Sequence, residues 1–306
     1  MQHLPVLVAE TLELLAPGRG GLFIDATVGL GGHAEALLQA SPDVRLVGLD
    51  RDPQALERAA RRLAPFGDRV SFVHANFDHL ESALASVGIR GGVAGVLADL
   101  GVSSLQLETA ERGFSFRLDG PLDMRMGLSE LTAADVVNQE SEGELERIFR
   151  EHGEERQARR IARAVVRARA EEPIVTTGQL KRVIGRAKGH SEREGRVDPA
   201  TRVFQALRIA VNEELAGLEG FIEQTVRLLA TDGRLVVISY HSLEDRIVKN
   251  TLRDLARGDV DQVTGRSRSE SQLIETLTRK PVRPSDEEVA LNPRSRSGRL
   301  RAARRL

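Results

Sequence analysis

The chain of 306 residues contains no cysteine, and this absence excludes several kinds of chemistry. Without a thiol, the protein can form no disulfide, no cysteine-ligated zinc site, no iron–sulfur cluster and no thiolate nucleophile. Long apolar runs are also missing: stretches such as residues 235–238 fall far short of the about 20 residues that a membrane span needs. No basic stretch leading into an apolar core opens the chain, so we expect no signal peptide, no membrane partner and a cytoplasmic location.

The charge is almost balanced, with 44 lysines and arginines against 45 aspartates and glutamates. A net charge of −1 argues against a general polyanion-binding protein. The arginines are unevenly distributed, however, because residues 292–306 contain six arginines and no acidic residue. Such a segment is typical either of a solvated tail or of a surface that contacts nucleic acid, and the sequence leaves both open.

Short apolar runs alternate with helical patterns over the first hundred residues and return near residue 234. Strands separated in this way predict βαβ units and a parallel sheet. The fold class is therefore α/β, with a Rossmann-like sheet domain. The predicted strands are residues 22–25, 44–49, 70–74, 92–97 and 234–240.

Between about residues 107 and 199 the alternation stops, and apolar residues recur at three- and four-residue intervals, which predicts helices. Ser141 and Glu144 have the spacing of a capping box, and Asp198-Pro199 predicts the start of a helix whose apolar stripe runs from Phe204 to Ile222. We therefore expect an all-helical domain inserted into the sheet domain. The expected segments are 1–106 and 200–306 for the sheet domain, 107–199 for the insertion, and a mobile polar loop at 257–272.

A glycine-rich stretch, DATVGLGGH at residues 25–33, lies where the first strand turns into the first helix. Glycines there let a ligand approach the backbone, and the helix N-terminus presents free N–H groups. Asp50 ends the second strand, where it can accept hydrogen bonds from ribose hydroxyls. This pattern suits either NAD or S-adenosylmethionine. Asp25 favours the second, because a carboxylate can meet the ammonium group of a methionine moiety but is poorly placed beside a pyrophosphate.

Asp99 ends the fourth strand and begins the stretch DLGVSSLQ, residues 99–106. The carboxyl ends of strands in an open α/β sheet face the ligand crevice, so Asp99 is predicted to point toward a substrate or cofactor. A carboxylate can accept a hydrogen bond from an exocyclic amine and help to localise its lone pair for direct in-line attack on a methyl group. No covalent enzyme intermediate is then needed, which agrees with the absence of cysteine. Asp99 is the catalytic candidate.

Taken together and in order, the motifs resemble those of the bacterial 16S ribosomal RNA cytosine-N4 methyltransferase family, the RsmH group, formerly called MraW. Two departures from the family's pattern are mild: Tyr240 stands where phenylalanine is more usual, and His152 where tyrosine is more usual. The matching stretches are His3 with 5–7, then 25–33, 48–52, 99–106, 111–116, 120–126, 152–156, 199–202, 204–209, 238–246 and 292–297.

The resemblance implies an S-adenosylmethionine-dependent methyltransferase that modifies the N4 of a cytosine in 16S ribosomal RNA, with the small ribosomal subunit as its partner. It implies no metal site. It leaves open which cytosine is modified, whether naked RNA or the assembled subunit is the substrate, and whether the enzyme is a homodimer. Phe77 would pack on the adenine, and Gln106 would close the methionine side. The implied cofactor-binding residues are Gly31, Gly32, His33, Asp50, Phe77, Asp99 and Gln106.

Three further residues are candidates for contact with the target base, each with a structural alternative. Phe114 and Phe116 could stack on a base that has left its own stack, or they could hold the inserted domain together. His241 follows the fifth predicted strand, where it could orient the base or a phosphate, or could cap the next helix.

Arg159, Arg160 and Arg163 lie on the polar side of a predicted helix and suit RNA phosphates, although a solvated, salt-bridged face gives the same pattern. Two other functions stay open from the residues alone. An NAD-dependent oxidoreductase would use the same glycine loop, and a non-catalytic RNA-binding protein would need only the arginines.

Overall fold

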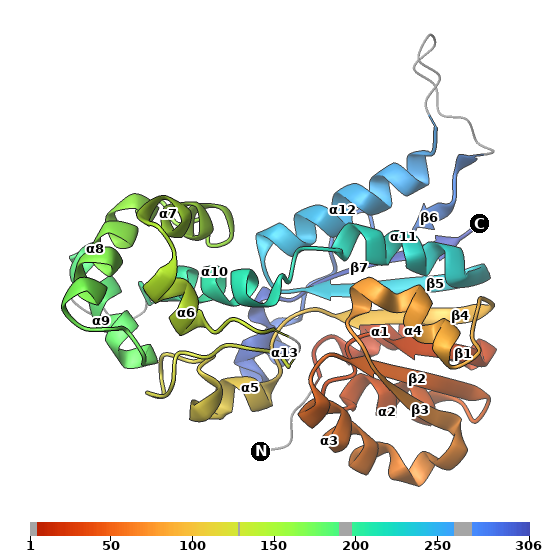
Figure 1. Ribbon diagram of the computed structural model, residues 1–306. Coiled ribbons are helices and arrows are strands. Elements are labelled where there is room, and N and C mark those ends of the chain that lie inside the picture. The colour runs from red at the N-terminus through yellow and green to blue at the C-terminus, as the bar shows by residue number, and fades with distance from the viewer. Residues whose placement is uncertain (1–4, 128, 190–197, 260–270) are drawn as a thin grey trace. The chain divides into compact units, whose positions relative to one another are not determined.

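The computed structural model describes residues 5–127, 129–189, 198–259 and 271–306 of the chain. The chain divides into two compact units. The sheet unit is formed by Met1–Gly101 and Ala216–Leu306, and the helical unit by Val102–Leu215. The helical unit is therefore an insertion in the sequence of the sheet unit (Figure 1).

Seven strands form one sheet. They are β1 (Gly21–Asp25), β2 (Val44–Asp50), β3 (Val70–His74), β4 (Val93–Asp99), β5 (Leu229–Ser239), β6 (Ile274–Thr276) and β7 (Arg299–Arg305). Their order is β3-β2-β1-β4-β5-β7-β6. The first five strands in this order run parallel, whereas β7 is antiparallel to both of its neighbours. The parallel order 3-2-1-4-5 is that of a Rossmann-like sheet, so the predicted fold class is confirmed.

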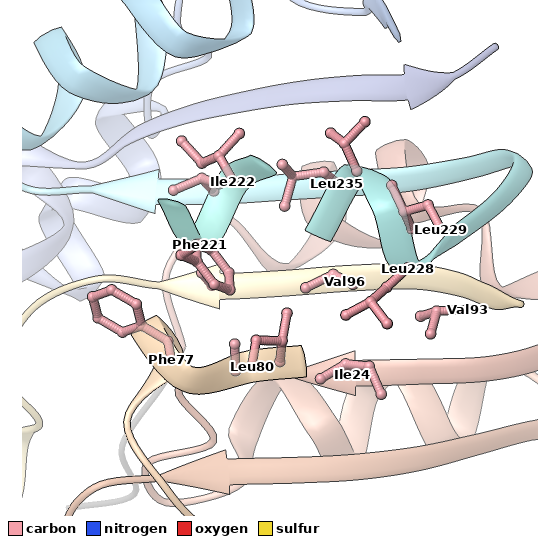
Figure 2. Packing of buried hydrophobic residues seen from close by; sticks show 14 of the residues in the cluster. Ile24, Phe77, Leu80, Val93, Val96, Phe221, Ile222, Leu228, Leu229 and Leu235 are labelled. Atoms are coloured by element: carbon pink, nitrogen blue, oxygen red, sulfur yellow. The ribbon is translucent and has the colours of Figure 1, made fainter. Parts of the chain in front are cut away.

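Helices cover both faces of the sheet. They are α1 (Val8–Leu15), α2 (Gly32–Ala40), α3 (Pro53–Leu63), α4 (Leu80–Ser86), α11 (Leu218–Leu228) and α12 (Ser242–Arg257), while α13 (Asp286–Leu291) of the same unit has no buried residue. Successive strand side chains enter opposite cores: Phe23 joins the one with α1, α2 and α3, and Ile24 the one with α4, α11 and α12. Figure 2 shows the second core around Ile24, Val96 and Leu235. Because both faces are buried, the parallel strands have nearly continuous apolar sequences.

In the described residues of the helical unit, the regular elements are all helical. They are α5 (Ser104–Glu108), α6 (Ala133–Gln139), α7 (Glu142–Glu151), α8 (Ala158–Glu171), α9 (Thr177–Lys188) and α10 (Thr201–Asn212), with a short 3-10 turn at Ala110–Arg112. Ser141 caps α7 by accepting a hydrogen bond from the backbone N–H of Glu144, as its spacing predicted. Leu145, Ile161 and Leu180 of successive helices meet in one core.

The boundaries between the units differ from the expected ones. The first lies after residue 101 rather than 106, and the second lies after 215 rather than 199. Helix α10 belongs to the helical unit because Val203 and Phe204 are buried in that unit's core. A single helix continuing to Ile222 was also a wrong prediction. Glu213 at φ 50° ends α10 and Gly217 at φ 75° precedes α11, so two helices share the apolar stripe.

Four of the six C-terminal arginines lie in strand β7 and the other two, Arg294 and Arg296, are exposed in a 3-10 helix (Pro293–Ser297), so the interpretation of the whole segment as a solvated tail is wrong. Arg301 is buried in the sheet unit, and its Nε lies 2.6 Å from Oδ1 of Asp245 on α12. Arg304 pairs with Asp232 at 2.9 Å and with Glu275 at 2.7 Å. These two arginines are therefore neutralised inside the unit by its own acidic residues.

The expected mobile loop at 257–272 falls mainly on residues 260–270, which lie outside the described residues, and α12 continues to Arg257. Among the residues that the structure describes, no helix has the length and apolar character needed to cross a membrane.

The pair between Arg301 and Asp245 makes a testable prediction about stability. Asp245→Ala leaves a buried guanidinium without its carboxylate and should lower the free energy of unfolding by about 3–5 kcal/mol. Arg304→Ala on the same strand is the matched control, because its exposed pairs should contribute about 1 kcal/mol or less. Urea unfolding of both variants measures the difference. Equal losses would show that burial of the Arg301 pair carries no special cost.

Candidate active site

Three aspartates end three neighbouring parallel strands. Asp25 ends β1, Asp50 ends β2 and Asp99 ends β4. Because β1 lies between β2 and β4 in the sheet, the three carboxyl groups occupy the same edge. This is the edge where open α/β sheets bind their ligands.

The loop after β1 is tied to the neighbouring strand β4. Oδ1 of Asp25 accepts a hydrogen bond from the backbone N of Thr27 at 3.2 Å. The Thr27 hydroxyl in turn accepts from the backbone N of Asp99 at 2.7 Å, and the N of Ala26 donates to the carbonyl of Leu97 at 2.8 Å. These hydrogen bonds fix Ala26 and Thr27, the first residues of the loop, to the ends of β1 and β4.

Asp50 holds the other half of the loop. Its Oδ2 accepts from the backbone N of Gly29 at 2.8 Å, and its Oδ1 from the N of Asp52 at 2.9 Å. Each carboxylate oxygen can accept a second hydrogen bond, so Asp50 retains acceptor capacity for ribose hydroxyls. The residue predicted to bind ribose therefore also shapes the glycine loop.

The two glycines at the start of α2 are required by geometry. Gly31 is the N-cap of α2 and has φ 77°, which side chains of L-residues rarely tolerate. At Gly32 the constraint is close approach, because a Cβ there would lie 3.0 Å from Cγ of Pro5. Gly32 lets the backbone of the N-terminal segment approach the start of the helix. Because neither Gly31 nor Gly32 has a side chain, neither residue covers the N–H groups of the first turn.

Asp99 has a polar partner at each oxygen. Its Oδ1 accepts a hydrogen bond from the hydroxyl of Tyr240, just after β5, at 2.8 Å. Its Oδ2 lies 3.6 Å from Nε2 of His33 in the first turn of α2. The structure thus brings together Asp99 and His33, two predicted site residues that are far apart in the sequence.

The electrostatics of this edge are dominated by buried acid. Burial, opposed in part by the hydrogen bond from Thr27 and reinforced by Asp99 and Asp50, raises the pKa of Asp25 to about 8. Burial likewise raises the pKa of Asp99 to about 7 and raises the pKa of Asp50 above its ordinary value. Within the described part of the chain, no lysine or arginine forms an ion pair with any of the three. A ligand with positive charge would supply what the site lacks.

Two more predicted residues follow the carboxyl ends of strands. Phe77 starts a short 3-10 helix (Phe77–His79) after β3 and packs edge-on against Phe221 of α11, with ring centroids 5.2 Å apart. Figure 2 shows both rings in the apolar core, and Phe77 is only 8% exposed. His241 is the N-cap of α12 and forms a capping box with Glu244, which confirms the capping alternative for this residue.

The remaining predicted residues belong to the helical unit. Gln106 is buried, and its side-chain oxygen accepts from the backbone N of Ser103 at 2.9 Å. Phe114 is 6% exposed, so little of its ring is open to a base. Phe116 is partly exposed and packs edge-on against Phe204 at 5.0 Å. The side chains of Arg159, Arg160 and Arg163 on α8 are exposed.

The sequence did not single out three polar residues that complete the site. Thr27 and Glu244 lie within motifs that were recognised, but their hydrogen bonds depend on the folded loop. Tyr240 was noticed only as a departure from a family pattern. A clue was available, because Tyr240 is the only tyrosine in the chain and occupies the carboxyl end of a predicted parallel strand.

Comparison with known proteins gives a consistent result. The MraW methylase family matches residues 1–306. The chain belongs to that family. A ribosomal RNA small subunit methyltransferase H from Geotalea daltonii is 53% identical and covers 100% of this chain and 99% of its own length. Another, from Symbiobacterium thermophilum, is 52% identical with coverages of 99% and 96%.

Solved structures add only distant likenesses. An rRNA methylase from Streptococcus thermophilus covers 100% of this chain and 99% of its own, with 11% identity and a TM-score of 0.42. That score is too low to support an argument about this chain. Membership of the MraW methylase family therefore rests on the sequence, and the recognition made from the motifs is confirmed.

Asp25 gives a prediction that separates stability from ligand binding. Its folded pKa of about 8 lies above the ordinary 3.8, so the folded chain binds this proton more tightly than the unfolded chain does. Stability from this group is therefore present at low pH and is lost as the pH rises toward 8. Asp25→Asn should raise the free energy of unfolding at pH 9 by about 1–3 kcal/mol, while the gain shrinks at pH 5.

Urea unfolding of the ligand-free protein at both values measures this effect. The exposed Asp68→Asn is the control and should change stability little at either pH. A stability loss in Asp25→Asn at pH 9 would contradict the assignment of Asp25 as a buried, uncompensated acid.

Proposed function

We propose that the protein is an S-adenosylmethionine-dependent methyltransferase that methylates the N4 of a cytosine in small-subunit (16S) ribosomal RNA, acting in the cytoplasm on the small ribosomal subunit. Family membership and relatives that are about half identical, each named a ribosomal RNA small subunit methyltransferase H, support the reaction and the RNA. The observation that carries the proposal is the group of three carboxyl groups beside the glycine loop, which no lysine or arginine among the described residues neutralises.

The donor set of this site fits S-adenosylmethionine. When bound, this cofactor supplies an electrophilic methyl group on a positively charged sulfur, open to direct in-line attack by an amine. Its sulfonium and ammonium groups carry the positive charge that buried carboxylates require. The residues of the sheet unit that would hold it are Gly31, Gly32, His33, Asp50, Phe77 and Asp99.

The same observation disfavours a nicotinamide dinucleotide. A pyrophosphate brought to the glycine loop would add negative charge beside Asp25, Asp50 and Asp99, each of which already has a raised pKa. No lysine or arginine among the described residues pairs with these carboxyl groups to offset that charge, and a basic side chain near them, that of His33, lies 3.6 Å from Asp99. An NAD-dependent oxidoreductase would instead need positive or neutral groups beside the glycine loop, because the pyrophosphate is negatively charged.

Asp99 is the residue best suited to the reacting amine. The exocyclic nitrogen of cytosine is a weak nucleophile because its lone pair is delocalised into the ring. A carboxylate that accepts an N–H hydrogen bond favours localisation of that pair and can hold the proton that the nitrogen loses. The acceptor must be ionised for this role, so methylation should become faster as the pH rises through the pKa of Asp99, which is about 7 in the ligand-free site and is lowered by the positive charge of a bound cofactor.

The reaction is tested with labelled S-adenosylmethionine, unmodified small subunits or naked 16S RNA, and nucleoside analysis. We expect N4-methylcytidine with the wild-type protein. Asp99→Asn should lower single-turnover methylation at saturating cofactor by roughly 10²-fold or more, the range for one positioned acid–base group. If saturation restores the rate, Asp99 serves only the cofactor. RNA binding without any methyl transfer by the wild type would instead identify a non-catalytic RNA-binding protein.

The RNA-binding surface is proposed to include one face of α8. Arg156, Arg159, Arg160 and Arg167 are all exposed, and none of them forms an ion pair with another described residue. Arg163 on the same face lies 3.6 Å from Glu142. Because two of the C-terminal arginines pair inside the sheet unit, this row is a better candidate for phosphate contact than β7.

Replacing Arg159 and Arg160 with alanine should flatten the salt dependence of RNA binding. Each phosphate contact adds about 0.7–0.9 to the slope of log affinity against log salt, so the slope should fall by about 1.4–1.8. Arg147 and Arg150 of the neighbouring α7 are the matched control, because they are exposed but pair with Glu144, Glu146 and Glu151. Equal changes in both double variants would show that α8 makes no particular contact with RNA.

A further inference from the structure

The hydroxyl of Tyr240 donates a hydrogen bond of 2.8 Å to Oδ1 of Asp99, the carboxyl group proposed to serve the reacting amine. The two residues are 141 positions apart in the sequence and meet because β4 and β5 are adjacent parallel strands. Tyr240 is also the only tyrosine of a chain that contains no tryptophan. The contact is therefore both specific and observable.

The ring of Tyr240 is held in place from several directions. Its backbone N donates to Oε2 of Glu244 at 2.8 Å, within the capping box that starts α12. On the other side, Gly101 lies so close that a Cβ there would come within 2.9 Å of the ring. Gly101 has φ 134°, a conformation that favours glycine, so the close approach is built into the backbone.

The second oxygen of Asp99 and its backbone have other partners. Oδ2 lies 3.6 Å from Nε2 of His33, and the backbone N of Asp99 donates to the hydroxyl of Thr27. The Tyr240 hydroxyl therefore bonds only to Oδ1, and this hydrogen bond fixes the rotation of the carboxyl group. A donor that bonds a carboxylate also stabilises its charged form over its neutral form.

We propose that Tyr240 is a positioning residue for Asp99: its hydroxyl holds Oδ1, so that the carboxylate stays charged and Oδ2 remains the oxygen that serves the ligand. This role rests on the proposed function, because positioning Asp99 matters for activity only if Asp99 takes part in methyl transfer. The hydrogen bond itself can be tested in the ligand-free protein.

The charged groups around Asp99 set the direction of the effect. Asp25 at the end of β1 and Glu244 of α12 are acidic, and His33 of α2 is the basic group that lies nearest. Burial and Glu244 raise the pKa of Asp99, and the hydrogen bond from Tyr240 lowers it, with about 7 as the result. Removing the hydroxyl should therefore raise the pKa of Asp99 further, by about one unit.

The fluorescence of Tyr240 reports this contact directly, because no other tyrosine or tryptophan emits. Hydrogen bonding to a carboxylate quenches tyrosine emission, and protonation of that carboxylate relieves the quenching. Emission of the ligand-free protein should therefore rise in a single transition as the pH falls through about 7. Asp99→Asn should abolish the transition, whereas Asp25→Asn should keep it, with Tyr240→Phe as the blank.

A flat titration of the wild type, or a transition that survives in Asp99→Asn, would overturn the proposal. These outcomes are independent of methyl transfer, so they are distinguishable from a failure of the proposed function. Thermal unfolding of each variant confirms that the compared proteins are folded.

Single-turnover methylation supplies the functional readout. Tyr240→Phe keeps the ring against Gly101 and removes only the hydroxyl. The acidic limb of its pH profile should move upward by about one unit, so its deficit should be about tenfold at pH values below the limb and should shrink toward pH 9. The same substitution in an Asp99→Asn background should have no further pH-dependent effect. A deficit of equal size at every pH would mean that Tyr240 has only a structural role.

Discussion

The constraint on which the rest of the site depends is the burial of acidic side chains at one edge of the sheet. Asp25, Asp50 and Asp99 end adjacent parallel strands, and no lysine or arginine among the described residues pairs with them. The chain compensates with dipoles instead of charges: backbone N–H groups of the glycine loop and the hydroxyl of Tyr240 donate to these carboxyl groups. Dipoles reduce the cost without cancelling the charge, so the edge remains selective for a cation.

The fold leaves this edge as the natural place for a ligand in the sheet unit. Helices cover both faces, and the apolar side chains of successive strand residues are buried in two separate cores, one on each face. Positive charge is directed elsewhere. Arg301 and Arg304 of β7 pair with acidic residues within the unit, while Arg159, Arg160 and Arg167 on α8 of the other unit are exposed and form no ion pair with a described residue. The acidic residues proposed to bind the cofactor and the arginines proposed to bind RNA thus belong to different compact units.

Much of this arrangement could be predicted from the sequence, and the exceptions have physical causes. Strands β2 and β4, with the aspartates that end them, follow from apolar runs that burial on both faces of a parallel sheet requires. Strand β7 could not be predicted, because a segment rich in arginine is typical of an exposed tail. In the structure Leu300 and Ala302 are buried, and Asp245 neutralises the buried Arg301 between them. The hydrogen bond between Tyr240 and Asp99 was likewise invisible, since it depends on the pairing of strands far apart in the chain.

The same side chains of the site both fix the local backbone by hydrogen bonds and face the proposed ligand. Sequence patterns alone therefore did not separate structural residues from ligand-binding residues. Asp50 accepts one backbone N–H bond from the glycine loop, at Gly29, and one from Asp52 at the start of α3, and it still has lone pairs for a ribose. His241 caps α12 through Glu244, and Glu244 also anchors the backbone of Tyr240 beside Asp99. A ligand that engages one of these carboxylates therefore acts on a hydrogen bond that also supports the loop. Binding and local order at this edge are coupled through the same atoms, which is where proteins commonly give up stability for function.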